Sequence, residues 1–158
     1  MHTFFALQGG NISRSSSWVG RIAYPGGGYN SWKTVCYGAS GNDIYVALNS
    51  YGYAAVSANG TNWTMYFTGQ AYAFNAVTYS STNNLFVAVG DSGKIITSAN
   101  GINWNLRSST NTGYAFNAIC WSGALFVAAG VQGVIYTSPD GVTWTSRTSG
   151  TSGTFYCI

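Results

Sequence analysis

Residues 85–104 read LFVAVGDSGKIITSANGINW, and this stretch decides the fold because the chain carries two further copies of it. Residues 125–144 read LFVAAGVQGVIYTSPDGVTW, and residues 44–63 read IYVALNSYGYAAVSANGTNW. The tryptophan that closes each copy lies 41 and then 40 residues after the one before it. A period of this length is typical of proteins that repeat one small unit of secondary structure.

Each copy, with the residues around it, contains four short strand-like runs separated by Gly, Asn and Ser. The second run is apolar almost throughout, as in residues 85–89. Burial of one face would give alternating apolar and polar residues, so a continuous apolar run indicates a strand covered on both faces. Four-stranded sheets that pack between two neighbours at this period predict a β-propeller.

The two chain ends supply the parts of one more copy. Residues 4–7, then residues 9–15 and Trp18, match the second to fourth strands, and residues 155–158 match the first strand. We therefore expect an all-β fold, a four-bladed β-propeller of four-stranded blades, closed by the C-terminal strand joining the N-terminal blade. The single domain, 1–158, would hold blades at 2–22 plus 153–158, about 31–67, about 73–108 and about 115–148. A closed monomeric ring is favoured, and a strand exchanged between subunits is the alternative.

The amino-acid composition excludes several classes of protein and of partner. Charged residues make up 6% of the chain, which has three Asp, no Glu and a formal net charge of +3. Low charge with 46% hydrophobic residues excludes a disordered chain. The cations are scattered, so we expect no nucleic-acid partner. No apolar stretch approaches the ~20 residues of a membrane span, so no membrane insertion is expected. No secretory signal is visible at the N-terminus, and a virion or extracellular surface is the favoured location.

The end of each copy reads Ser-x-Asn/Asp-Gly-x-x-Trp, which resembles the Asp-box of sialidase-type (BNR) repeats. The preceding Gly-x-Ile-x-Thr-Ser pattern is similar to bacterial and phage proteins with such repeats, including photosystem II assembly-factor-like propellers. The motif residues are Ser57, Asn59, Gly60, Trp63, Ser98, Asn100, Gly101, Trp104, Ser138, Asp140, Gly141 and Trp144. The resemblance implies a sialidase-like fold and leaves activity open, because Asp-boxes recur in proteins of unrelated function.

The chemistry of this motif predicts a structural role. An Asx side chain followed by Gly makes a tight turn in which the side-chain oxygen accepts backbone N–H groups. The Trp would then cover the edge of the blade. Two of the three copies carry Asn where the motif has Asp. A metal site or a catalytic carboxylate would not survive that exchange, whereas a turn would.

The sequence contains few side chains that could act in catalysis. The sialidases that the motif resembles use three Arg, a Tyr–Glu pair and an Asp acid, but this chain has no Glu. Arg107 and Arg147 lie three residues after a motif Trp in successive copies, which indicates a repeated structural role. Asp140 belongs to a turn, and Asp43 and Asp91 lie in different loops, so a two-carboxylate hydrolase is hard to assemble. We expect no enzyme activity, no cofactor and no metal.

Three cysteines, Cys36, Cys120 and Cys157, follow no metal-binding spacing. Cys36 and Cys120 occupy the same place in two copies, within apolar runs. They are interpreted as buried small hydrophobic residues, and a pairing among the three across a narrow channel is the alternative.

One face of such a propeller would carry the loops from strand two to three and from strand four to the next blade. These loops are aromatic and polar. The candidate ligand-binding residues are Tyr29, Trp32, Tyr51, Tyr72, Asn75, Asp91, Tyr114, Asn117 and Gln132. Tyrosine rings beside amides suit neutral sugars and also polar protein interfaces. The alternative is that Tyr72 and Tyr114 only pack between blades.

The favoured hypothesis is a non-catalytic binding or interaction propeller. It would be a surface-displayed recognition or structural module of a phage or virus particle or of a bacterial surface assembly. Its partner would be a glycan or a protein surface, including other virion or assembly subunits. A soluble lectin with blade-repeated glycan sites and an assembly or scaffold factor are the alternatives, and a glycosidase comes last.

Overall fold

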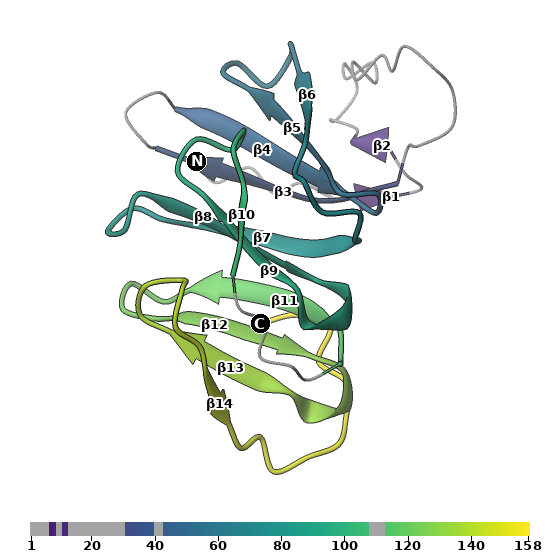
Figure 1. The fold of residues 1–158 in the computed structure, drawn as a ribbon, viewed down its shortest axis with the longest axis vertical. Helices are drawn as coiled ribbons and strands as arrows, with labels where there is room; N and C mark the ends of the chain where they lie inside the picture. Colours follow the sequence, from purple (N-terminus) through teal and green to yellow (C-terminus); the bar gives the residue numbers. More distant parts are fainter. Residues whose placement is uncertain (1–6, 9–10, 13–30, 40–42, 108–112) are drawn as a thin grey trace.

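A computed structural model describes residues 7–8, 11–12, 31–39, 43–107 and 113–158, and the structural statements below refer to these residues. Their regular structure consists of β-strands and two single 3-10 turns, η1 (Asp91–Gly93) and η2 (Val131–Gly133) (Figure 1). The expectation of an all-β chain is confirmed.

Three antiparallel four-stranded sheets follow one another along the chain, each built from four consecutive strands in spatial order. The first contains β3 (Trp32–Gly38), β4 (Ile44–Asn49), β5 (Tyr53–Ser57) and β6 (Thr64–Phe67). The second contains β7 (Phe74–Ser80), β8 (Leu85–Gly90), β9 (Ile95–Ser98) and β10 (Asn105–Leu106). The third contains β11 (Phe116–Trp121), β12 (Phe126–Gly130), β13 (Ile135–Ser138) and β14 (Thr145–Arg147). Each repeat copy thus forms one sheet.

The second sheet lies between the other two, and the first strands β3, β7 and β11 are neighbours from sheet to sheet (Figure 1). Strand β8 shows why its sequence is apolar throughout. Phe86 and Ala88 pack into the core shared with the first sheet. Val87 and Val89, on the other face, pack into the core shared with the third sheet. All four are fully buried, as expected for a strand covered on both faces.

The first strand of each four-stranded sheet begins with a bulge, at Lys33, Asn75 and Asn117. The pairing register shifts between residues 32 and 34, 74 and 76, and 116 and 118. A bulge re-aims side chains relative to the regular alternation of a strand. The residue before each bulge points into the core, and for Trp32 this differs from the expectation of a loop-face residue. Trp32 is only 6% exposed and packs with Ala47 and Ala55.

The chain ends have partial structure. Strands β1 (Leu7–Gln8) and β2 (Asn11–Ile12) form a two-stranded antiparallel sheet, and β1 lies against β3. Residues 155–158, where sequence predicts a strand, belong to no sheet within the described residues. Phe155 N–H nevertheless donates to Gly130 O at 2.9 Å. Four blades and ring closure therefore stay predictions.

No helix in the described part of the chain is long and apolar enough to cross a bilayer.

Candidate functional site

The turns between second and third strands lie beside the connections that enter each sheet. Ser50 N donates to Ser31 O at 3.0 Å, and Asp91 N donates to Ala73 O at the same distance. Val131 N donates to Ala115 O at 3.1 Å in the third sheet. We call this side of the stacked sheets the loop face, and the opposite side, which carries the Ser-x-Asn/Asp-Gly turns, the box side.

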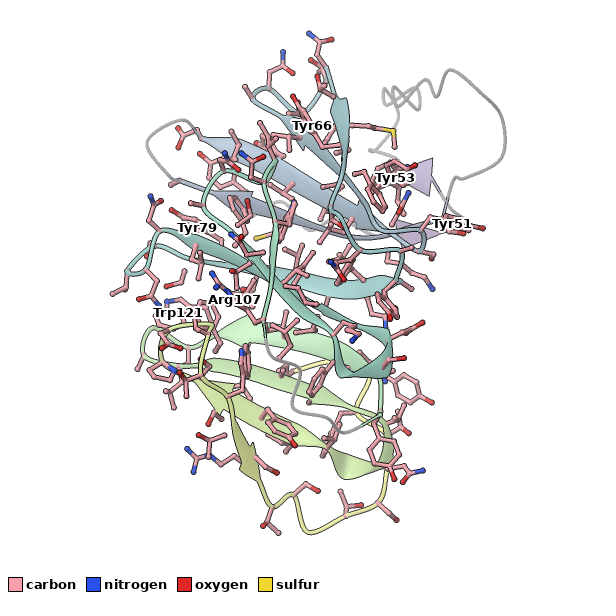
Figure 2. All side chains as sticks on the ribbon, viewed as in Figure 1. Tyr51, Tyr53, Tyr66, Tyr79, Arg107 and Trp121 are labelled. Atoms are coloured by element: carbon pink, nitrogen blue, oxygen red, sulfur yellow. The ribbon has the colours of Figure 1, made fainter. Side chains whose placement is uncertain are left out.

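Figure 2 shows Tyr51 on the loop-face side of the molecule and Tyr79 and Trp121 on the opposite side. Three loop-face tyrosines are exposed to a similar extent: Tyr51 by 42%, Tyr72 by 38% and Tyr114 by 42%. Each side chain therefore presents part of its surface to solvent, which is what an amphipathic ligand surface needs.

On the loop face, Asn75 bridges the second and third sheets, at the boundary that we call the seam. Its position in the bulge of β7 lets one side-chain amide, Nδ2, donate to Asp91 Oδ1 at 3.0 Å and to Phe116 O at 3.0 Å. The first bond fixes a carboxylate of its own sheet, and the second reaches the first strand of the next sheet. Turn η1, which contains Asp91, also lies against β11. Asp91 is thus an exposed, oriented carboxylate at the seam.

Asn117 repeats this arrangement one sheet further along. Its Nδ2 donates to Phe155 O at 2.9 Å, in the place that Phe116 O takes for Asn75. The bulge thereby turns two predicted ligand-binding amides toward the neighbouring backbone. Both side-chain amides are therefore bonded within the protein itself.

The loop face of the second sheet also carries a cation–π contact between Lys94 and Tyr72. Lys94 Nζ lies 5.0 Å from the centroid of the Tyr72 ring. Contacts of this geometry attract a cation to the electron-rich ring face. Lys94 was not predicted as a site residue. Its position immediately after η1 is the sequence feature that could have indicated it, because η1 lies beside the aromatic connection that enters the sheet.

The remaining predicted residues are distributed as follows. Gln132 is exposed at the tip of η2, in a left-handed conformation with φ of 54°, and Ser92 has the same conformation in η1. Trp32 belongs to the core, so the loop face does not include its ring. Tyr29 lies outside the described residues.

The box turns form the same hydrogen-bond pattern in all three sheets. In residues 98–104, Ser98 Oγ accepts the Gly101 N–H at 2.8 Å, and Asn100 Oδ1 accepts two N–H groups at 3.0 and 2.9 Å. Trp104 Nε1 donates back to Gly101 O at 2.8 Å. The other two turns repeat these bonds, with Asp140 in place of Asn in the third. Each of these side-chain oxygens is occupied by the turn itself.

Aromatic rings also pack against one another on the box side, and sequence reasoning missed them. Tyr37 pairs with Tyr45 across β3 and β4 at 5.0 Å between centroids, and the Trp63 ring is 6.4 Å from Tyr45. The register also pairs Tyr79 with Phe86 and Trp121 with Phe126. A hydrogen bond to the Asp43 carboxylate raises the pKa of Tyr37. The signal was the aromatic residue near the end of each first strand, which is Tyr37, Tyr79 or Trp121.

Within the residues that the structure describes, the carboxylates and arginines do not gather into one site. Asp91 follows the end of β8 on the loop face, whereas Asp43 precedes β4 and Asp140 follows β13, both on the box side. Arg107 Nε donates to Thr97 Oγ1 at 2.7 Å, and Arg147 Nε donates to Thr137 Oγ1 at 2.9 Å. These equivalent bonds tie each arginine to its own sheet. Within the described ranges, no three His, Cys, Asp or Glu side chains group as metal ligands would.

All three cysteines are free thiols; Cys36 and Cys120 are partly buried, and Cys157 is exposed. Burial raises the pKa of the Cys36 thiol to about 12, so this group is not a nucleophile near neutral pH.

Several solved structures share this arrangement of sheets. A structure described as YCF48 bound to D1 peptide is 22% identical, with a TM-score of 0.58 over 73% of this chain and 39% of that one. The computationally designed proteins Ika8 and Ika4 are 13% and 15% identical, with TM-scores of 0.63 and 0.64. Ika8 aligns over 81% of this chain and 39% of its own, and Ika4 over 82% and 80%.

The chain therefore spans about four tenths of the YCF48 chain that it matches. No protein-family model and no curated protein matches the sequence. Identities this low bear on the fold alone, and YCF48 and the designed proteins are β-propellers. The sialidase-specific type stays a prediction from the box motif. Three consecutive four-stranded sheets with propeller neighbours support a β-propeller fold for this chain.

Proposed function

We propose that this chain is a non-catalytic binding propeller that engages a polypeptide partner through its loop face. The observation that carries the proposal is the seam between the second and third sheets. There the Asp91 carboxylate, held by Asn75, lies on the same face as exposed Tyr72 and Tyr114. Tyrosine beside oriented polar groups is the composition of polar protein interfaces. YCF48, a structural neighbour, is described as bound to a peptide, which fits such a role.

The absence of catalysis is part of the proposal. Glycoside hydrolysis needs two carboxylic groups about 5–10 Å apart across the scissile bond. Asp91 is on the opposite side of the sheets from Asp43 and Asp140, and Asp140 is engaged in its turn. Arg107 and Arg147 each bond a threonine of their own sheet and do not converge.

We also propose that the ring closes as four blades, with residues 155–158 as the first strand of the blade that β1 and β2 continue. Asn117 supports this, because it holds the Phe155 carbonyl as Asn75 holds that of Phe116. Deleting residues 155–158 should then lower the free energy of unfolding in urea while the protein stays monomeric in light scattering. Unchanged stability would contradict closure, and a stable dimer of the full chain would favour strand exchange.

The biological setting remains a proposal from sequence. Low charge and abundant Ser, Thr, Asn and Gly motivate a phage particle or bacterial surface assembly. A glycan-binding role uses the same tyrosines, so a glycan array belongs beside the peptide experiment.

The test is selection from a phage-displayed library of random 12-residue peptides on the immobilised 158-residue chain. Selected peptides are then titrated against the wild type, a Tyr72→Ser/Tyr114→Ser variant and a Tyr37→Ser control. Tyr37 is a matched control because it is 46% exposed and lies on the box side. Buried aromatic contacts dominate such interfaces, so we expect the loop-face variant to bind at least about tenfold more weakly.

The control should bind as the wild type does. Peptides that bind all three proteins equally, or that are lost only with Tyr37→Ser, would overturn the loop-face proposal. If no peptide is selected but the array finds a glycan whose binding needs Tyr72 and Tyr114, the chain is a lectin and the polypeptide proposal is wrong.

A further inference from the structure

Asp91 is the feature that distinguishes the second sheet from its neighbours. When the three copies are aligned without gaps, Ser50 and Val131 occupy the position of Asp91. Lys94 likewise corresponds to Tyr53 and Val134. The hydrogen-bonded framework repeats from sheet to sheet, but the charge does not. Among the described residues, the loop face therefore carries one aspartate, at one seam, whereas the bulge of the first sheet carries the exposed cation Lys33.

From this we infer that the partner inserts an arginine side chain at the seam between the second and third sheets, where its guanidinium pairs with the Asp91 carboxylate. The inference rests on the proposed function and names the chemistry of the partner. It commits to a polypeptide that carries arginine, because the site offers a negative charge together with aromatic surfaces.

The carboxylate is oriented before a partner arrives. Asn75 Nδ2 donates to Asp91 Oδ1 and to Phe116 O, both at 3.0 Å, so the amide cannot turn away without losing a bond to the next sheet. Oδ2 has no partner within the part of the chain that the structure describes, and no Lys or Arg there pairs with Asp91. An exposed carboxylate fixed in this way can accept a guanidinium without first losing side-chain freedom.

Two exposed tyrosines lie in the loop-face connections that enter the second and third sheets. Tyr72 is in the connection that enters the second sheet, and Tyr114 is in the connection that enters the third, two residues before the Phe116 carbonyl that Asn75 holds. Lys94 Nζ lies 5.0 Å from the Tyr72 ring centroid, so the chain's own ammonium engages that ring and an incoming guanidinium must approach beside it. Guanidinium is planar, stacks on rings and pairs with carboxylates through two N–H groups, so it suits the site better than an ammonium.

The experiment uses the same displayed library and then a thermodynamic cycle. One selected arginine-containing peptide and its Arg→Gln version are titrated against wild type, Asp91→Asn and Asp43→Asn. Asparagine at position 91 keeps an oxygen to accept the Asn75 amide, so the fold is retained. Asp43→Asn removes the same charge from the box side and is the matched control for net charge.

We expect arginine to be enriched among selected peptides. Asp91→Asn should weaken the arginine peptide about fivefold, as a pair at the edge of an interface would, and leave the glutamine peptide unchanged. Asp43→Asn should change neither peptide. The fivefold effect should shrink when the NaCl concentration is raised from 0.05 to about 0.5 M.

Other outcomes separate the two proposals. Peptides that lack arginine but need Tyr72 and Tyr114 would overturn the arginine inference and leave the binding proposal standing. Equal effects of Asp91→Asn and Asp43→Asn would do the same. If no selected peptide depends on the loop face, both proposals fall.

Discussion

Gly101 offers a quantitative test of how the sheets pack. It is the glycine of the second box turn, with φ of +71°, and a Cβ at this position would lie 2.5 Å from Val46 Cγ2 in the first sheet. Val46 is fully buried in the core between the two sheets, so displacing its methyl group would disturb the packing of that core. Gly101→Ala therefore combines backbone strain with overpacking.

Two other left-handed glycines allow these effects to be separated. Gly69 has φ of +80°, and a Cβ added there would meet nothing within 4 Å, whereas a Cβ at Gly141 would meet Val87 Cγ2 at 3.0 Å. Left-handed strain costs about 1–2 kcal/mol, offset in part by the reduced entropy of the unfolded chain. Gly69→Ala should thus cost about 1 kcal/mol. Overpacking adds about 1–3 kcal/mol, so Gly101→Ala should cost about 2–4 kcal/mol, with Gly141→Ala between them.

Urea denaturation, followed by tryptophan fluorescence, measures the free energy of unfolding of each variant. The double variant Gly101→Ala/Val46→Ala should be more stable than the sum of the two single effects predicts, by at least about 1 kcal/mol, because the second change removes the clashing methyl. Equal costs for Gly69→Ala and Gly101→Ala, or strict additivity in the double variant, would refute the packing of box turns onto the preceding sheet.

Three further predictions concern single side chains. The Thr143 and Val142 N–H groups lower the pKa of Asp140, so the stability that its carboxylate contributes is present above the usual carboxyl pKa and is lost as the pH falls through the lowered pKa. Asp140→Asn should therefore be folded at neutral pH and should lose less stability than the wild type in acid. Identical curves of unfolding free energy against pH for the two proteins would contradict this. Burial raises the pKa of the Cys36 thiol to about 12, whereas Cys157 is exposed, so iodoacetamide at pH 8 should label Cys157 first. Cys157→Ser should then abolish the fast phase of labelling. Rapid labelling of Cys36 in the native protein would contradict its burial. Asn117→Ala should speed hydrogen exchange in residues 150–158, since Phe155 O loses its donor, and unchanged exchange would show that this bond does not hold the segment.

The repeat made much of the fold predictable. The apolar run of residues 85–89 correctly indicated a strand buried on both faces, and its three copies indicated three four-stranded sheets. Four blades did not follow in the same way, because the strands assigned to the chain ends are matched over few residues. Closure depends on pairing between distant segments, and local patterns do not encode that.

The loop face was harder to predict because side-chain direction there depends on the bulge. Nothing in the residues around Lys33, Asn75 and Asn117 marks a bulge in advance. Trp32 could have been assigned to the core, since it aligns with Phe74 and Phe116, which are fully buried. Sequence placed Asp91 and Asn75 in one candidate group, but their hydrogen bond and the Lys94–Tyr72 contact are tertiary features.

The most direct test of the central claim is chemical-shift mapping of backbone amides as a selected peptide is added to the 15N-labelled chain. The account predicts the largest changes in residues 71–75, 91–94 and 113–117, with the box turns at 98–104 and 138–144 unaffected. Changes concentrated in the box turns or around Tyr37 and Asp43 would contradict it, because the partner would then bind the opposite side of the sheets.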